Sequence, residues 1–201
     1  MMNWKQLISA KRFGMEEFHE ERQENRSEFQ RDYDRLIFSA PFRRLQNKTQ
    51  VFPLPGSVFV HNRLTHSLEV ASVGRSLGDD VAKALLERHP ELQDSFLPEI
   101  GSIVSAACLA HDLGNPPFGH SGEKAISTFF SEGKGVRLKE KQPNGEQLSP
   151  MEWEDLIHFE GNANAFRILT HQFEGRRKGG FVLTYTTLAS IVKYPFSSSL
   201  A

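Results

Sequence analysis

Residues 62–88, NRLTHSLEVASVGRSLGDDVAKALLER, carry the clearest indication of the fold. Apolar residues recur in them at steps of four or at multiples close to the helical period, and they are Leu64, Leu68, Leu77, Val81 and Leu85. This pattern predicts one long amphipathic helix whose apolar face packs toward the core. The pair His89-Pro90 follows, and we expect the helix to end there because a proline disfavours helical geometry in the residue before it.

Helices are also expected on both sides of this stretch. Residues 26–46 carry apolar side chains at three- and four-residue steps, and they predict a helix interrupted near Pro41. A second long helix should begin near Pro98, which suits a first helical turn, and stop at Gly114. Residues 49–60 lie between helical blocks and contain two prolines and a glycine, so they indicate either a loop or a short hairpin.

The C-terminal half continues the helical pattern with one interruption. Residues 122–130, GEKAISTFF, predict a short helix, and residues 160–194 predict two helices around the turn EGRRKGG. Residues 131–150 are polar, contain Gly and Pro and show almost no apolar periodicity, which indicates an exposed loop. We therefore expect an all-α protein, a helical bundle in one domain that spans residues 1–201.

Composition places the chain among ordinary globular proteins. It is 38% hydrophobic, which is enough for a core. Its formal net charge of -1 argues against a surface built as a whole to bind nucleic acid, although a local basic patch could still bind it. A single cysteine, Cys108, excludes a disulfide framework and favours a reducing, cytoplasmic setting. Because no stretch is apolar for long enough, we expect neither a signal peptide nor contact with a membrane.

Three residues suggest a metal site. His66 lies on the long predicted helix, one turn after Arg63, while His111 and Asp112 close the next long helix. A divalent metal needs imidazoles and carboxylates that converge from separate elements. A carboxylate at a helix C-terminus also opposes the helix dipole, so Asp112 needs a compensating cation, which a metal would supply. The plain alternative is that each histidine is an ordinary core or boundary residue.

Five ordered sequence blocks carry a resemblance to a known family. HNRLTHSLEV at residues 61–70 and HDLGNPPFGHSGE at residues 111–123 resemble the signature of HD-domain triphosphohydrolases. Further blocks are similar to the deoxyguanosine triphosphatase branch, namely FRRLQNKTQVF, FEGNANAFRILT and LTYTTLASIVKYP. Five blocks in order are much more specific than an HD pair alone. The chain thus resembles the N-terminal part of such an enzyme.

This resemblance implies a metal-dependent enzyme with an HD-domain helical bundle. His66, His111 and Asp112 would be three of four ligands to a divalent ion, and manganese, magnesium and iron all accept such ligands. The fourth ligand of the family is an aspartate from a later helix. Asp155 is the only aspartate after Asp112, and it precedes the FEGN block, in the wrong order. We therefore expect the family pattern to run past Ala201, which makes the bundle truncated at the C-terminus.

The resemblance also implies further site residues. His120 would act as acid or base near the scissile bond, and Glu123 would hold its ring in place. The residues that would contact the substrate are Gln50, Arg63, Asn115, Asn162, Lys193 and Tyr194. Gln50 matches a family position that contacts the sugar and base, and Arg63 offers a forked phosphate donor. The structural alternatives are helix capping for His120 and Glu123 and a surface salt bridge for Arg63.

The implied activity is attack of water on the α-phosphorus of a deoxynucleoside triphosphate, with dGTP favoured, to release the deoxynucleoside and tripolyphosphate. The resemblance also implies a homo-oligomer and is compatible with single-stranded nucleic acid at basic runs. Two alternatives stay open. Another HD-domain phosphohydrolase, such as a phosphodiesterase or an alarmone hydrolase, would share the three ligands without the KTQV, EGN and KYP blocks. A non-catalytic nucleotide- or nucleic-acid-binding module would account for the missing fourth ligand.

Overall fold

The computed structural model describes residues 3–17, 26–49, 62–140, 142, 147–175, 178–194 and 196. Across these residues the secondary structure is helical, with no strands and only two isolated backbone bridges, Arg12 to Thr184 and Thr49 to Asn62. The α-helices are α1 (Trp4–Leu7), α2 (Glu28–Ile37), α3 (Ala40–Arg44), α4 (Arg63–Arg88), α5 (Ile100–Ala110), α6 (His120–Ser131), α7 (Pro150–Ile157), α8 (Gly161–Thr170) and α9 (Tyr185–Ile191). The 3-10 helices are η1 (Leu45–Asn47), η2 (Pro90–Leu92), η3 (Leu97–Glu99) and η4 (Lys134–Lys139). The predicted all-α class is confirmed.

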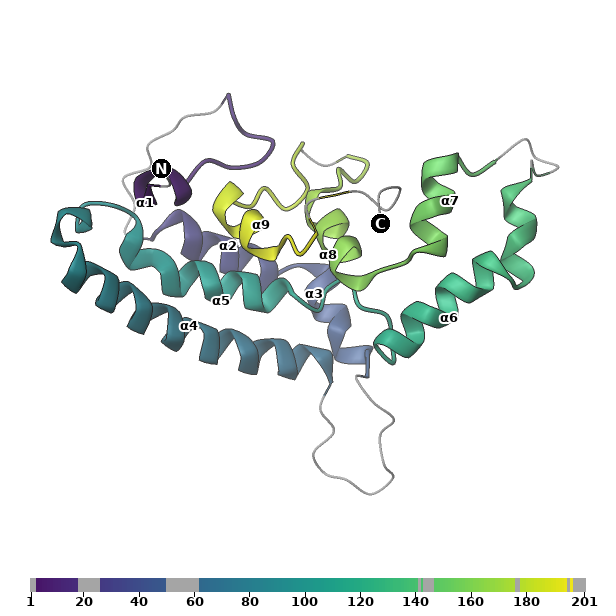
Figure 1. The fold of residues 1–201 in the computed structure, drawn as a ribbon, viewed down its shortest axis with the longest axis horizontal. Helices are drawn as coiled ribbons and strands as arrows, with labels where there is room; N and C mark the ends of the chain where they lie inside the picture. Colours follow the sequence, from purple (N-terminus) through teal and green to yellow (C-terminus); the bar gives the residue numbers. More distant parts are fainter. Residues whose placement is uncertain are drawn as a thin grey trace, which may run out of the picture.

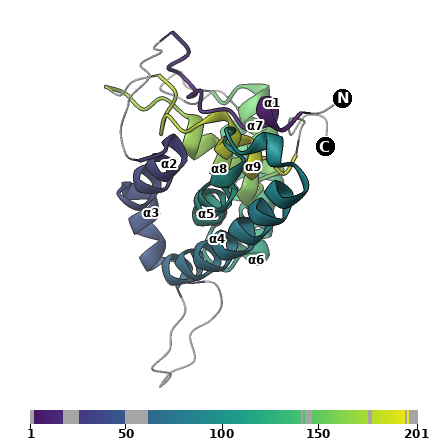
Figure 2. The ribbon, with the colours of Figure 1, turned by 90° about the vertical axis from the view of Figure 1, so that its left-hand side faces the viewer.

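Helix α5 runs through the centre of the molecule. It packs against α2, α4 and α9, as the two perpendicular views of the ribbon show (Figures 1 and 2). The buried side chains of the main core include Leu36, Leu45, Leu109, Leu113 and Leu183. Each buried leucine contributes roughly 1.5–3 kcal/mol relative to an exposed one, so this core holds α5 firmly in place. Because His111 follows α5 directly, the core also fixes the position of the predicted metal ligands.

Helix α4 is the predicted long helix, and Leu64, Leu68 and Leu85 pack against the core as expected, but its most buried face is a different one. Leu77 and Val81, expected in the core, are 61% and 51% exposed. The buried residues of α4 are mostly small, namely Arg63, Ser67, Ala71, Gly74, Gly78 and Ala82. A Cβ on Gly78 would lie 2.7 Å from the Cα of Gly101 in α5. The two helices therefore approach through glycine, which the spacing of large apolar residues does not reveal.

Helix α5 ends earlier than the sequence suggested. The expected stop was Gly114, whereas α5 ends at Ala110 and His111 is its C-cap. The residues that follow form a turn packed on the start of α8, since a Cβ on Gly114 would lie 2.1 Å from the carbonyl oxygen of Gly161. The pair His111 and Asp112 thus lies just beyond the helix.

The expected interruption within residues 26–46 is confirmed. Helix α2 ends at Ile37, and Ser39 caps α3 by accepting a hydrogen bond from the backbone N–H of Phe42 at 3.2 Å. Pro41 lies in the first turn of α3, where its missing N–H costs no helical hydrogen bond. The chain therefore turns at residues 38–39, immediately before the proline.

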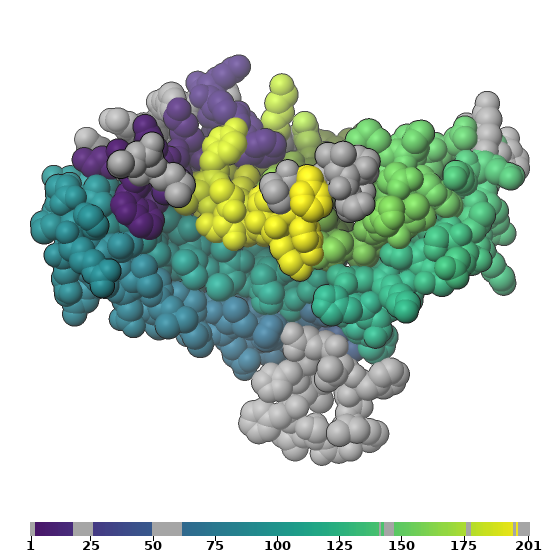
Figure 3. Space-filling view, in the orientation of Figure 1, coloured from purple at the N-terminus to yellow at the C-terminus, as the bar shows by residue number. Residues whose placement is uncertain are grey.

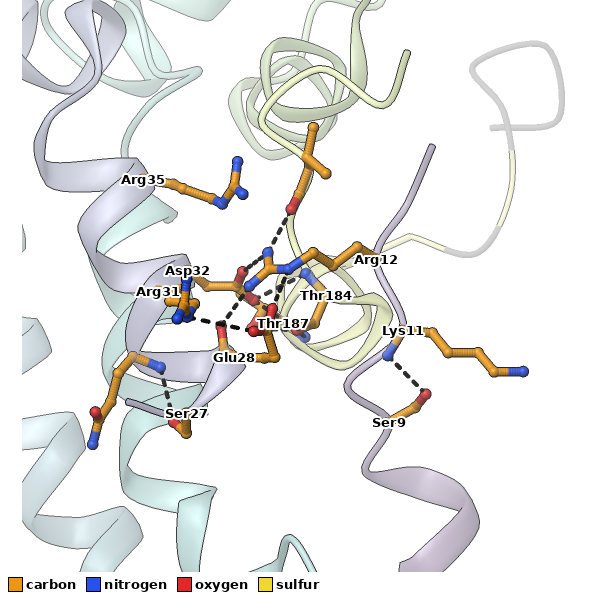
Figure 4. Close-up of polar contacts among 12 residues, drawn as sticks. Ser9, Lys11, Arg12, Ser27, Glu28, Arg31, Asp32, Arg35, Thr184 and Thr187 are labelled. Carbon is orange, nitrogen blue, oxygen red and sulfur yellow. Dashed lines mark hydrogen bonds and ion pairs between the residues drawn. The ribbon is translucent and has the colours of Figure 1, made fainter. Parts of the chain in front are cut away.

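A buried polar network joins the N-terminal segment to α2 and to the start of α9 (Figure 4). The guanidinium of Arg12 pairs with Asp32 at 2.7 Å and with Glu28 at 2.5 Å, and it donates to the carbonyl oxygen of Val182 at 2.6 Å. The other oxygen of Asp32 accepts hydrogen bonds from the N–H and hydroxyl of Thr184. Three segments distant in sequence are thus tied together.

Helices α6 and α7 form an arm on one side of the bundle (Figure 1). The helix expected at residues 122–130 is confirmed as α6. Within the exposed loop expected at 131–150, residues 134–139 are mostly exposed but form the 3-10 helix η4. Helix α7 was not predicted. Its Trp153 is buried and meets Phe130 of α6 with ring centroids 6.5 Å apart. This aromatic contact, absent from any local pattern, orders the arm.

The last helices agree with the prediction, since α8 and α9 occupy residues 160–194. Figure 3 shows the yellow segment after α9 on the surface, between the purple N-terminal segment and the green region of α7 and α8. Residues 50–61, and with them most of the predicted loop or hairpin at 49–60, lie outside the described residues. Among the helices that are described, none is both long and apolar enough to cross a lipid bilayer.

Candidate metal centre

The three predicted metal ligands meet at one place. His66 comes from the first turns of α4, His111 caps α5, and Asp112 is the next residue. One ligand atom from each lies within 4.8 Å of the other two, and the two imidazole rings meet with centroids 5.3 Å apart. The structure therefore brings together from two helices the residues that the sequence proposed. In the part of the chain that is described, no fourth His, Cys, Asp or Glu joins them.

The backbone orients the ring of His111. Its Nδ1 lies 2.6 Å from the carbonyl oxygen of Cys108. Because a carbonyl only accepts hydrogen bonds, Nδ1 carries a hydrogen, and Nε2 is the ring nitrogen left to bind a metal. This second nitrogen lies 3.5 Å from Asp112 Oδ1. Metal-binding histidines commonly donate their other N–H to a carbonyl in this way, so the arrangement suits a ligand.

The two carboxylate oxygens of Asp112 have different surroundings. Oδ1 pairs with Nη1 of Arg63 at 2.8 Å and accepts a hydrogen bond from Nδ2 of Asn115 at 2.5 Å. Oδ2 is buried and has no hydrogen-bond partner among the described residues. Leaving such an oxygen unpaired costs on the order of 1–3 kcal/mol, and more for a charged group. Two imidazoles and this carboxylate oxygen form a donor set that fits a divalent cation.

Asp112 already has protein cations nearby, so its place at the end of α5 does not by itself require a metal. The side chain of Arg63 is 5% exposed and already pairs with Asp112. Lys48 adds a second cation, because its Nζ donates to the carbonyl oxygens of Leu113 at 3.4 Å and Asn115 at 3.1 Å. Desolvation lowers the pKa of Lys48, Arg63 lowers it further, and Asp112 opposes both. Two protein cations therefore compensate the helix end, and the metal inference rests on Oδ2 and the imidazoles.

His120 and Glu123 form a pair at the start of α6. The Nδ1 of His120 lies 2.7 Å from Glu123 Oε2, and the His120 side chain is 95% exposed. The other oxygen of Glu123 accepts a hydrogen bond from the N–H of Gly161 at 2.8 Å. Before the pair, Phe118 and Gly119 adopt positive φ angles of 68° and 57°. A non-glycine residue in this strained region is uncommon and is typical of turns near functional sites.

The start of α8 gathers the remaining predicted residues. Glu160 caps the helix by accepting from the N–H of Ala163, and its Oε1 accepts from Nδ2 of Asn162 at 2.5 Å. The same oxygen lies 3.8 Å from Nζ of Lys193, whose ammonium is over the ring of Tyr194 at 5.0 Å. A hydrogen bond with Tyr194 is the main cause that raises the pKa of Lys193. Asn162 and Lys193 thus lie beside one carboxylate, and Tyr194 lies beside Lys193.

Three further predicted substrate contacts are Arg63, Asn115 and Gln50. Arg63 is buried against Asp112 and the carbonyl oxygen of Pro116, so its forked donor faces the turn in this structure. Its contact with phosphate stays a prediction, as does the role of Asn115. Gln50 lies outside the described residues.

Sequence reasoning did not single out Lys48 or Glu160. Both lie inside blocks that it used, Lys48 in KTQV and Glu160 in EGN. Attention to the charged residues of those blocks would have found them.

Comparison with known proteins supports the family resemblance independently of the site geometry. The HD domain family model matches residues 63–178, which is more than half of the chain. The chain is 50% identical over 197 residues to a deoxyguanosinetriphosphate triphosphohydrolase-like protein of Synechocystis sp., covering 98% of this chain and 43% of the relative. It is 48% identical over 201 residues to a protein of the same description from Pseudomonas aeruginosa, covering 98% of this chain and 42% of that one.

A relative with lower sequence identity has a similar name. The deoxyguanosinetriphosphate triphosphohydrolase of Yersinia enterocolitica is 38% identical over 219 residues, covering 96% of this chain and 41% of the relative. The chain therefore spans less than half the length of these relatives. The family model covers all three candidate ligands, His66, His111 and Asp112. On these grounds the chain belongs to the HD-domain family, among the relatives of the deoxyguanosine triphosphate triphosphohydrolases.

Proposed function

We propose that the chain carries the N-terminal part of the site of a deoxynucleoside triphosphate triphosphohydrolase, with dGTP as the favoured substrate. The single observation that carries the proposal is the convergence of His66, His111 and Asp112, with the buried Oδ2 of Asp112 left unpaired. The names of the similar proteins from three bacteria support the same reaction.

His66, His111 and Asp112 would hold a divalent cation, with manganese, magnesium and iron as candidates. A bound cation of this kind supplies charge to a phosphoryl oxygen and lowers the pKa of water. The chain supplies the rest of the chemistry. The His111 ring is held by the Cys108 carbonyl, and Asp112 is held by Arg63, so the ligands are preorganised.

His120 is the proposed proton carrier. Its ring is exposed, which leaves Nε2 accessible to a substrate, while Glu123 holds Nδ1. A histidine in such a pair can donate or accept a proton near neutral pH. Asn162, Lys193 and Tyr194 would contact the phosphates, where the lysine ammonium offers a point charge for a polyanion.

The experiment measures tripolyphosphate released from each of the four deoxynucleoside triphosphates with added Mn²⁺ or Mg²⁺. It compares the 201-residue chain and the full gene product with Asp112→Ala and Asp80→Ala variants of each. Asp80 is an exposed aspartate on the same helix as His66 and serves as the matched control. We expect metal-dependent release, greatest with dGTP, that Asp112→Ala abolishes and Asp80→Ala leaves intact.

The other outcomes separate the alternatives. Phosphodiester or alarmone hydrolysis that depends on Asp112, without tripolyphosphate release, would indicate another HD-domain phosphohydrolase. Binding of nucleotide or single-stranded DNA without any hydrolysis in either form would indicate a binding module. Tripolyphosphate release that survives Asp112→Ala would show that the reaction takes place at a different site.

A further inference from the structure

The turn between α5 and α6 is held by two cationic side chains. Nζ of Lys48 donates to the carbonyl oxygens of Leu113 at 3.4 Å and Asn115 at 3.1 Å. Nη2 of Arg63 donates to the carbonyl oxygen of Pro116 at 3.3 Å. Three carbonyl oxygens within four residues of the turn thus receive N–H groups from outside it. We call Lys48 and Arg63 together the cation clamp.

The two members of the cation clamp are joined to each other through the backbone. The N–H of Arg63 donates to the carbonyl oxygen of Lys48 at 3.1 Å. Next to this bond, Thr49 and Asn62 form an isolated antiparallel bridge. The two cations therefore approach the turn from one short piece of paired backbone. Thr49 of this piece also accepts a hydrogen bond from the N–H of Phe118 at 3.4 Å, just after the turn.

The environment of Lys48 is unfavourable for a lysine that only stabilises the fold. Its ammonium is partly desolvated, which lowers its pKa, and Arg63 adds repulsion. Two carbonyl oxygens and the nearby carboxylate of Asp112 offset this. The hydrogen bonds to the two carbonyl oxygens thus hold the Lys48 ammonium against the turn.

We infer that Lys48 is a positioning residue for Asp112, acting through the turn that it clamps together with Arg63. With the turn fixed, Asp112 keeps Oδ1 against Arg63 and Asn115, and its carboxylate stays within 4.8 Å of the ligand nitrogens of His66 and His111. Lys48 itself reaches the backbone carbonyls and not the carboxylate, so its effect on the ligand is indirect. The role of Lys48 in metal binding rests on the proposed function. The contacts of the cation clamp with the turn do not, because they form in the chain without metal.

The test uses the full chain with three variants. Lys48→Met keeps the length of the side chain and removes the charge, Lys48→Arg keeps a cation, and Lys83→Met changes an exposed lysine of α4 as the control. Amide hydrogen exchange is measured first, in metal-free buffer. The N–H groups of Leu113 and Asn115 are bonded within the turn, to Ala110 at 3.1 Å and to Asp112 at 3.2 Å, so they report its opening.

In Lys48→Met we expect exchange at Leu113 and Asn115 to be about tenfold faster, with the amides of the middle of α5 unchanged. Mn²⁺ affinity, titrated by electron paramagnetic resonance, should fall about tenfold, as for other residues that orient metal ligands. Lys48→Arg should restore both quantities in large part, and Lys83→Met should match the wild type.

Other results would overturn the inference. Unchanged exchange at the turn in Lys48→Met would show that the clamp does not hold it. Faster exchange over the whole chain would show a role in the fold and not in the turn. If the wild type binds no Mn²⁺ and hydrolyses no nucleotide, the proposed function fails, while the exchange measurement still decides whether Lys48 fixes the turn.

Discussion

Glu123 connects two parts of the candidate site through its two carboxylate oxygens. Oε2 lies 2.7 Å from Nδ1 of His120, and Oε1 accepts from the N–H of Gly161 at 2.8 Å. Gly161 is also packed tightly, because a Cβ there would lie 1.8 Å from the side-chain oxygen of Asn115. Glu123 therefore fixes the exposed ring of His120 relative to the start of α8. A glutamine of the same size has one acceptor oxygen and one NH₂ donor, so it can keep both contacts only if His120 takes the tautomer with its hydrogen on Nε2.

Replacing Glu123 with glutamine should impair catalysis more than binding. We expect Glu123→Gln to lower kcat by about 100-fold, at the lower end of what general acid–base groups contribute, with KM changed only slightly. Steady-state kinetics of tripolyphosphate release provide the measurement. Glu132→Gln, at an exposed position that caps the end of the same helix, is the control. A kcat within twofold of the wild type would show that Glu123 only caps the helix.

At the scale of elements, the contact between α4 and α5 determines where His66 meets His111. The apolar spacing predicts helix α4, but it does not predict which face of α4 packs against α5. Large residues on one stripe, Leu77 and Val81, face outward, while glycines and alanines face α5. Spacing alone assigns the buried face to the largest side chains, and it misses an interface built by close backbone approach.

Adding one methyl group at this interface should destabilise the protein. In Gly78→Ala the new Cβ would lie 2.7 Å from the Cα of Gly101, so the backbone of one helix has to move. We expect a loss of about 1–3 kcal/mol in the free energy of unfolding, measured by urea denaturation. The higher helix propensity of alanine offsets roughly 1 kcal/mol of the overpacking penalty. Asp80→Ala, exposed on the same helix, is the control, and a more stable Gly78→Ala would contradict the close packing.

At the scale of the whole molecule, the Arg12 network connects segments separated by more than 150 residues (Figure 4). Asp32 is fully buried and binds both Arg12 and Thr184. Through Thr184, which caps α9, the network positions the helix that leads to Lys193. The candidate phosphate contacts therefore depend on residues far from the metal ligands in sequence.

Removing the central carboxylate should destabilise the whole chain. Asp32→Ala leaves the guanidinium of Arg12, which is 9% exposed, without its buried partner. Breaking a buried ion pair in this way costs about 3–5 kcal/mol, so the urea midpoint should fall sharply. Asp34→Ala, which removes a more exposed partner of Arg26, should lower stability by less than about 1 kcal/mol. Equal midpoints for both variants would show that the network does not support the fold.

Local patterns and family blocks predicted which residues come together as candidate metal ligands and predicted most helices, but not every contact between the helices. His66, His111 and Asp112 were found because their residue types stand in specific blocks. Burial of Arg63 against Asp112 and burial of Trp153 against Phe130 depend on partners that are distant in sequence. Tertiary contacts of this kind leave no periodic trace, so the structure was needed to find them.

The most direct test of the central claim is a titration of the chain with Mn²⁺, followed by electron paramagnetic resonance. We predict one bound ion per chain, with affinity reduced at least about tenfold in Asp112→Asn and in His66→Ala. Asp80→Asn should bind as the wild type does. Equal affinity in the wild type and Asp112→Asn, or no specific binding in the wild type, would contradict a metal centre formed by His66, His111 and Asp112.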